Sequence, residues 1–130
     1  MASILKVNTL TGVTAAGTIA VTAEGGTTTT NLQQGLCKCW GLDNEGANPD
    51  TDSFNVASST DNGTGDYTKT FTNGFATGDR YCFVGTSNEN TYSTIFISAK
   101  AAGSIRITNE NISGAAHDIH TGYQIDGDLA

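Results

Sequence analysis

Residues 52–74 constrain the fold of this chain more than any other stretch, because they combine alternating side chains with a central run of turn formers. Tyr67, Lys69 and Phe71 lie two positions apart, and side chains at that spacing share one face of a pleated strand. Before them, the sequence DNGTG at residues 61–65 tolerates positive φ and local side-chain hydrogen bonds. The pattern predicts a β-hairpin and carries no catalytic motif.

The chain after residue 30 repeats this texture of short alternating segments separated by turn residues. Apolar residues do not recur at helical spacing over three turns, whereas turn signals recur every ~8–12 residues, as is typical of a sandwich or barrel. Residues 42–51 read as a polar loop, and the last predicted strand is expected at a sheet edge or against another subunit. The predicted strands cover residues 36–40, 53–58, 66–72, 80–86, 91–99, 104–109 and 119–125.

Residues 1–30 differ from the rest because their apolar residues come in small groups without a large aromatic anchor. Alternation persists at residues 3–8 and 18–22, which favours short strands over a flexible tail. Such a segment cannot bury a core alone, so we expect an extended N-terminal arm that attaches to a neighbouring subunit or a larger particle. Residues 31–130 are expected to form one all-β domain, a compact antiparallel sandwich or barrel-like knob.

Composition narrows the possible partners. The formal net charge is −7 with a pI near 4.4, and six basic residues scattered along the chain cannot form the basic stripe that nucleic acids or anionic membranes require.

No apolar run reaches the ~18–20 residues of a transmembrane helix. Lys6 and Asn8 interrupt any secretory signal, and three cysteines fit a reducing compartment, so folding in the cytosol is expected. With 37% hydrophobic residues, a 130-residue chain also gains from burying surface against copies of itself.

The thiols are the first candidates for a metal site. Three cysteines together with a histidine could supply the four ligands of tetrahedral zinc: Cys37, Cys39, Cys82 and either His117 or His120. However, the first two thiols are separated by one residue on an alternating strand, not by two residues in a tight turn. A free cysteine on a strand face usually packs as a small apolar residue, and we favour this interpretation.

The sequence HDIH at residues 117–120 is the candidate for acid–base chemistry, because a His–Asp pair can transfer protons near neutral pH. No nucleophile motif accompanies it. A surface or subunit-contact segment is the favoured interpretation, and we predict no catalytic, cofactor-binding or metal-binding residue in the chain.

Acidic and aromatic residues suggest two further kinds of site. The acidic loop residues could hold Ca²⁺, but they lack the spacing of an ordered calcium loop, so solvated turn residues are favoured. They are Asp43, Glu45, Asp50, Asp52, Asp61, Asp66, Asp126 and Asp128. The aromatic residues could line a sugar-binding face, although aromatics at strand spacing more often belong to a core. They are Trp40, Tyr67, Phe71, Tyr81, Phe83, Tyr92 and Phe96.

Three strings carry a resemblance to a known group: MASILKVNTLTG at residues 1–12, NLQQGLCKCW at 31–40 and DSFNVASSTDNGTGDYTKTFTNG at 52–74. The chain resembles small tail-fibre-like and virion surface structural proteins of marine tailed bacteriophages. From residue 79 onward the similarity is limited to the general pattern of short alternating segments separated by turn residues. The resemblance implies a non-enzymatic, β-rich, trimeric subunit on the particle surface. The chain is shorter than full tail fibres, which add a long shaft, so a fibre tip, a short fibre and a capsid decoration protein all stay open.

We therefore expect a non-enzymatic structural protein of a tailed-phage virion, a homotrimeric surface fibre or knob that contacts other tail or major capsid proteins. It would be assembled in the host cytoplasm and lie on the virion surface, without nucleic acid or membrane insertion. The alternatives are a receptor- or glycan-binding module of a fibre tip that contacts the host surface, and a capsid decoration protein. A glycan depolymerase is disfavoured, because no pair of carboxylates stands out among so many acidic loop residues.

Overall fold

The computed structural model describes residues 5–12, 19–22, 26–27, 29–32, 35–44, 50, 52–87 and 93–129. Within these ranges the chain contains strands and turns but no helix, which confirms the predicted all-β class, and no segment there could cross a membrane as a helix. The chain divides into two compact units, Met1–Leu36 and Cys37–Ala130. The sequence prediction placed this division after residue 30.

In its described residues, the N-terminal unit contains one short antiparallel pair, β1 (Ala20–Thr22) with β2 (Thr29–Asn31). The strand predicted over residues 3–8 lies partly outside the described residues, and Leu5–Asn8 form no strand. Attachment of this unit to a neighbouring subunit stays a prediction.

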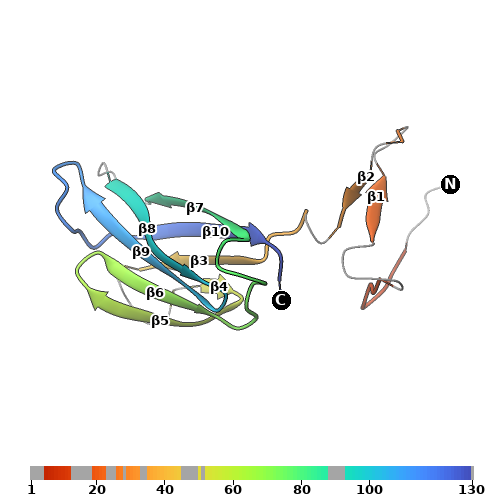
Figure 1. Cartoon of the computed structure of the whole chain (residues 1–130), viewed down its shortest axis with the longest axis horizontal. Coiled ribbons are helices and arrows are strands. Elements are labelled where there is room, and N and C mark those ends of the chain that lie inside the picture. Colours follow the sequence, from red (N-terminus) through yellow and green to blue (C-terminus); the bar gives the residue numbers. More distant parts are fainter. Residues whose placement is uncertain are drawn as a thin grey trace. The chain divides into compact units, whose positions relative to one another are not determined.

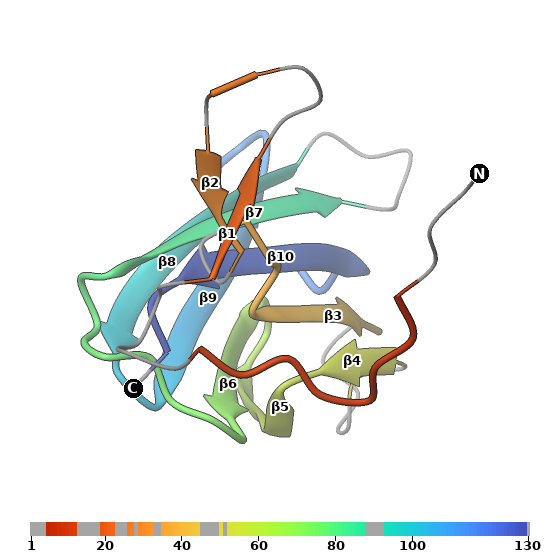
Figure 2. The ribbon, with the colours of Figure 1, turned by 90° about the vertical axis from the view of Figure 1, so that its right-hand side faces the viewer.

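The C-terminal unit is a sandwich of two four-stranded antiparallel sheets (Figures 1 and 2). Sheet I contains, in spatial order, β4 (Asp52–Phe54), β3 (Cys39–Asp43), β10 (Thr121–Gly127) and β7 (Tyr81–Ser87). Sheet II contains β5 (Val56–Gly63), β6 (Asp66–Phe71), β9 (Ser104–Asn111) and β8 (Ser93–Ala101). The predicted sandwich is therefore confirmed.

The alternation of side chains along β6 and β9 places one face of sheet II toward the interior. Tyr67, Lys69 and Phe71 are buried on β6, as predicted from their spacing. Ile105 and Ile107 are buried on β9, where they pair with Lys69 and Tyr67 in register. Residues that pair directly across an antiparallel ladder point to the same face, so these side chains form one continuous inner surface.

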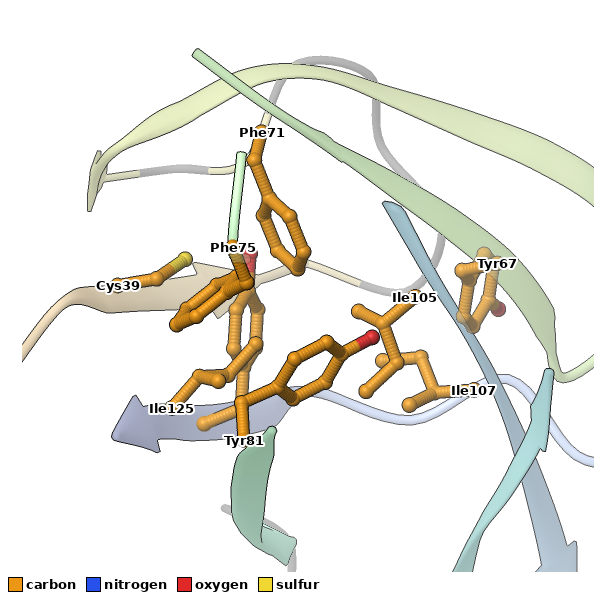
Figure 3. Packing of buried hydrophobic residues seen from close by; sticks show 9 residues of the cluster. Cys39, Tyr67, Phe71, Phe75, Tyr81, Ile105, Ile107 and Ile125 are labelled. Carbon is orange, nitrogen blue, oxygen red and sulfur yellow. The ribbon is translucent and has the colours of Figure 1, made fainter. Parts of the chain in front are cut away.

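The apolar core is built around three aromatic rings (Figure 3). The ring of Phe71 lies 5.0 Å from that of Phe75 and 5.9 Å from that of Tyr81, both in edge-to-face geometry. This is the arrangement that aromatic quadrupoles prefer. Ile125 from β10 also belongs to the cluster, so both sheets contribute to it.

Residues 53–58, predicted as one strand, are in fact two strands in different sheets. Asn55 adopts a φ of 63°, and the chain leaves sheet I before it and enters sheet II after it. Its side-chain amide donates to the carbonyls of Lys38 and Asn73, 3.0 Å away in each case, and its Oδ1 accepts from the Asn73 amide at 2.7 Å. Asparagine tolerates the left-handed region, so a single residue makes this corner, which alternation alone does not reveal.

The prediction that residues 119–125 form an edge strand is wrong, because β10 lies in the centre of sheet I. Tyr123 pairs with Gly41 of β3 on one side and with Gly85 of β7 on the other. Gly41 leaves the space that the Tyr123 side chain occupies, whereas a Cβ at Gly85 would lie 2.7 Å from the Phe83 ring. In addition, β3 continues to Asp43, into the segment predicted as a polar loop.

The turn between β5 and β6 is held against a distant part of the chain. Gly65 has a φ of +67°, and its carbonyl accepts a hydrogen bond of 2.7 Å from the Asn109 amide. A Cβ at this position would lie 2.6 Å from the Asn109 carbonyl oxygen and 2.7 Å from the His117 amide nitrogen. Both the backbone angle and the surrounding backbone therefore require glycine.

We predict that Gly65→Ala lowers the free energy of unfolding by about 1–3 kcal/mol, from the left-handed backbone and the contact with fixed backbone atoms. Gly103→Ala is the matched control, since a Cβ there meets nothing within 4 Å. Urea denaturation followed by tryptophan fluorescence measures both. Equal midpoints for the two variants would contradict this account of the turn.

Candidate functional site

A charged cluster lies between the two sheets where an apolar core would be expected. Lys69 of β6 has a fully buried side chain, with Nζ 2.9 Å from Asp43 Oδ2 and 2.6 Å from Asp50 Oδ1. The same ammonium donates to Ser59 Oγ at 2.7 Å. These residues come from β3, the segment after it, β5 and β6, so the cluster connects the two sheets. We call Asp43, Asp50, Ser59, Lys69 and Tyr123 the buried charged cluster.

Tyr123 completes this cluster from the centre of sheet I. Its hydroxyl donates to Asp50 Oδ2 at 2.5 Å. Burial and the hydrogen bond to Asp50 raise the pKa of Tyr123 far above its ordinary value, so the phenol stays a donor. Gly41 makes room for it, because a Cβ there would overlap the hydroxyl and lie 2.6 Å from Asp50 Oδ2.

Aromatic rings surround the ammonium and keep the cluster dry. Lys69 Nζ lies 5.6 Å from the centroid of the Tyr67 ring and 5.8 Å from that of Tyr123. Ring faces attract cations at such distances, and a low local dielectric strengthens each charged contact. The side chains of Lys69, Asp43 and Asp50 are at most 1% exposed, so a molecule in solution does not contact them.

Placing Asp43 and Asp50 among solvated turn residues is wrong, since both are buried in this cluster. Glu45, from the same acidic group, lies outside the described residues. By contrast, Asp61 accepts from the Gly63 amide in the hairpin turn, and Asp66 forms an ion pair with Arg106 at the surface. The overlooked signal is Lys69, because a lysine between two inward-facing aromatic residues needs carboxylate partners in the interior.

A second polar contact fixes the segment before β10. Asp118 Oδ1 accepts a 2.6 Å hydrogen bond from the Gly65 amide and another from the Tyr67 hydroxyl. The bond from Tyr67, the bond from Gly65 and the nearby His117 hold the pKa of Asp118 below its ordinary value of 3.8. Asp118 is exposed, in agreement with the surface segment favoured from the sequence, and it also positions the hairpin turn.

The thiols are not gathered into a ligand set. Cys39 is fully buried, and burial raises the pKa of its thiol to about 12, so it stays protonated as an apolar core residue. Cys37 is half-buried, with Sγ 3.2 Å from the Cys39 carbonyl oxygen, and Cys82 is exposed. Among the described residues, no group of three or more His, Cys, Asp or Glu side chains could hold a metal ion.

The aromatic residues divide between the interior and two separate surfaces. Tyr67, Phe71 and Tyr81 are core residues, as favoured from their spacing. Trp40 is half-buried on sheet I, whereas Phe96 belongs to sheet II and is 46% exposed, so the fold does not join them in one face. Tyr92 lies outside the described residues.

Comparison with protein-family models, with curated proteins and with solved structures finds no match to this chain.

We predict that Lys69→Met lowers the free energy of unfolding by about 3–5 kcal/mol, because two buried carboxylates lose the ammonium that compensates them. Arg80→Met is the control, since Arg80 is an exposed cation. Denaturant titration of both variants tests the prediction. A loss for Lys69→Met no larger than that for Arg80→Met would show that the cluster adds little to stability.

The lowered pKa of Asp118 predicts a specific acid sensitivity. A group with a lowered folded-state pKa stabilises the fold above its unfolded-state pKa, and that contribution is lost as the pH falls through the folded-state value. Stability should therefore decline below about pH 4. Asp118→Asn should flatten this decline because it removes the titrating carboxyl, and Tyr67→Phe should flatten it because it removes the hydroxyl that stabilises the carboxylate. Denaturation midpoints across acidic pH measure it, and an unchanged slope in both variants would contradict the assignment.

Proposed function

We propose that this protein is a non-enzymatic structural subunit of a tailed-phage virion, a homotrimeric knob on the surface of the tail or capsid. Its resemblance to small phage surface proteins at residues 1–12, 31–40 and 52–74 supports the proposal. Lys69, Asp43 and Asp50 are enclosed between the sheets, where their ion pairs connect β6 to β3 and to the segment after it.

The observation that carries the proposal is a largely apolar row across the outer face of sheet I, which Gln124 on β10 interrupts. Trp40 pairs with Phe54 on β4 and with Gln124 on β10, which in turn pairs with Val84 on β7. These side chains therefore point to one face across all four strands. Phe54 is 53% exposed and Val84 is 68% exposed, while Leu42 next to the row is 42% exposed.

An exposed row of this kind is a contact surface. Exposed apolar side chains grouped on one face mark sites of protein association, and aromatic residues are enriched where subunits meet. A short domain leaves much of its apolar surface in water, so pairing such faces between copies lowers the free energy of the assembly. We propose that this row, which we call the sheet I row, lies in the subunit interface.

Charge distribution gives the N-terminal arm a separate role in assembly. Lys6 and Glu24 are the charged residues of positions 1–36, so the arm is neutral and the whole net charge of −7 falls on residues 37–130. Knobs of like charge repel one another, whereas a neutral segment can approach any of them. Leu5 is 80% exposed and Leu10 is 55% exposed, which provides apolar groups for contact with a neighbouring subunit.

The sheet I row also favours a second candidate, a glycan-binding surface at a fibre tip. Phe54 and Trp40 are paired neighbours, and Gln124 beside them supplies amide hydrogen-bonding groups. Sugar rings stack on aromatic faces whose edges carry such groups. The isolated protein would then block adsorption of the phage to its host, which a purely structural knob would not do.

The oligomeric state of the full chain tests the leading proposal. We expect a trimer by light scattering at micromolar concentration, and dissociation on Val84→Glu because a carboxylate would be forced into an apolar interface. Thr60→Glu on sheet II is the matched control and should leave the trimer intact. A stable monomer, or equal dissociation of both variants, would overturn the proposal.

The location of the protein in the particle distinguishes a tail fibre or knob from a capsid decoration protein. Immunogold labelling and quantitative mass spectrometry of intact virions give location and copy number. A copy number in proportion to the major capsid protein would indicate a decoration protein, and a copy number in proportion to tail proteins would indicate a fibre or knob.

A further inference from the structure

The buried charged cluster brings together the reactants of an amide bond. An amine and two carboxyl groups meet inside the sandwich, with Lys69 Nζ 2.9 Å from Asp43 Oδ2 and 2.6 Å from Asp50 Oδ1. Effective concentrations in well-oriented intramolecular reactions reach about 10⁵–10⁸ M. All three side chains are at most 1% exposed, so water does not compete for the carboxyl carbon.

We propose that Lys69 and Asp43 form an intramolecular isopeptide bond, which covalently joins β6 of sheet II to β3 of sheet I. Asp50 carries the proton in this reaction. The bond is a self-modification of the folded chain and does not depend on the role of the protein in a particle.

The reaction is a condensation without an oxidant or a cofactor. Asp50 takes one proton from the Lys69 ammonium, and the lone pair of the resulting amine attacks Cγ of Asp43 to form the C–N bond. The C–O bond to one carboxyl oxygen then breaks, and that oxygen leaves as water with two of the three ammonium protons. The third proton stays on the amide nitrogen, so an ammonium and a carboxylate become one amide and one water molecule.

Burial favours the neutral amide product. Three ionised groups would leave one net negative charge among Lys69, Asp43 and Asp50, and an unbalanced buried charge is costly. Conversion of an ion pair into a neutral amide removes two charges from the interior, whereas the reverse reaction needs a water molecule to enter.

The contacts of the two carboxyl groups give them different roles in the reaction. Asp50 has both oxygens occupied, one by Lys69 Nζ and one by the Tyr123 hydroxyl, so it is held in place beside the reacting nitrogen. Asp43 ends the regular strand β3, where it pairs with Thr121 of the central strand β10. Its backbone is therefore fixed relative to the facing lysine, which makes it the acceptor of the new bond.

The mass of the intact protein tests the proposal directly. Under denaturing conditions, the purified full chain should be lighter than its sequence mass by one water molecule. Trypsin does not cut after an acylated lysine, so a digest should contain residues 39–80 as a single peptide, again lighter by one water. An intact protein at the sequence mass, with normal cleavage after Lys69, would overturn the proposal.

Three variants identify the groups involved. Lys69→Arg keeps the positive charge but lacks the amine, so it should show its full sequence mass. Asp50→Asn removes the proton carrier and should also show its full mass over the time in which the wild type is fully linked. Asp43→Asn should still react, but with loss of ammonia in place of water. Loss of water from Asp43→Asn would place the bond on Asp50 and overturn the assignment to Asp43.

Circular dichroism of each variant establishes that it is folded. If Asp43→Asn or Asp50→Asn does not fold, fragmentation of the wild-type 39–80 peptide decides the acceptor, because the two possible bonds close loops of different length. Fragment ions that place the link at Asp50 would overturn the assignment to Asp43, and fragment ions that place it at Asp43 would support it.

Discussion

The contact of Lys69 with Asp43 and Asp50 is the interaction on which the sandwich depends. It crosses from one sheet to the other, and each group in it would be costly to bury without its partners. The contact therefore requires β3, β6 and the segment around Asp50 to be in place together. Because a strand that slips by one residue turns every side chain to the opposite face, the ammonium also fixes the register of β6.

The interior has an apolar part and a charged part, which contribute to the fold in different ways. The rings of Phe71, Phe75 and Tyr81 fill one part, where apolar contact supplies the free energy of folding. Lys69 and its partners fill the other, where hydrogen bonds define a unique arrangement. Gly41 allows the aromatic part and the charged part of the interior to coexist, because the Tyr123 ring passes over its Cα to reach the carboxylate of Asp50.

Local patterns predicted the strands better than their places in the sheets. The two-residue spacing of Tyr67, Lys69 and Phe71 marked β6 and its inward face, because strand geometry alone determines which side chains share a face. The central position of β10 and the corner at Asn55 could not be predicted, since both follow from contacts between distant residues. Asp43 and Asp50 resemble loop residues until their partner, nineteen positions beyond Asp50, is known.

The central place of β10 has a consequence for how the protein is made. Sheet I is completed only when Thr121–Gly127 enters between β3 and β7, whose residues are synthesised much earlier. A chain still emerging from the ribosome thus carries two unpaired strand edges, with an open gap between them. Such edges are templates for pairing with other chains, and pairings distant in sequence form slowly. Nascent copies on neighbouring ribosomes are therefore exposed to mispairing, and slower translation of residues 93–127 would lengthen that period.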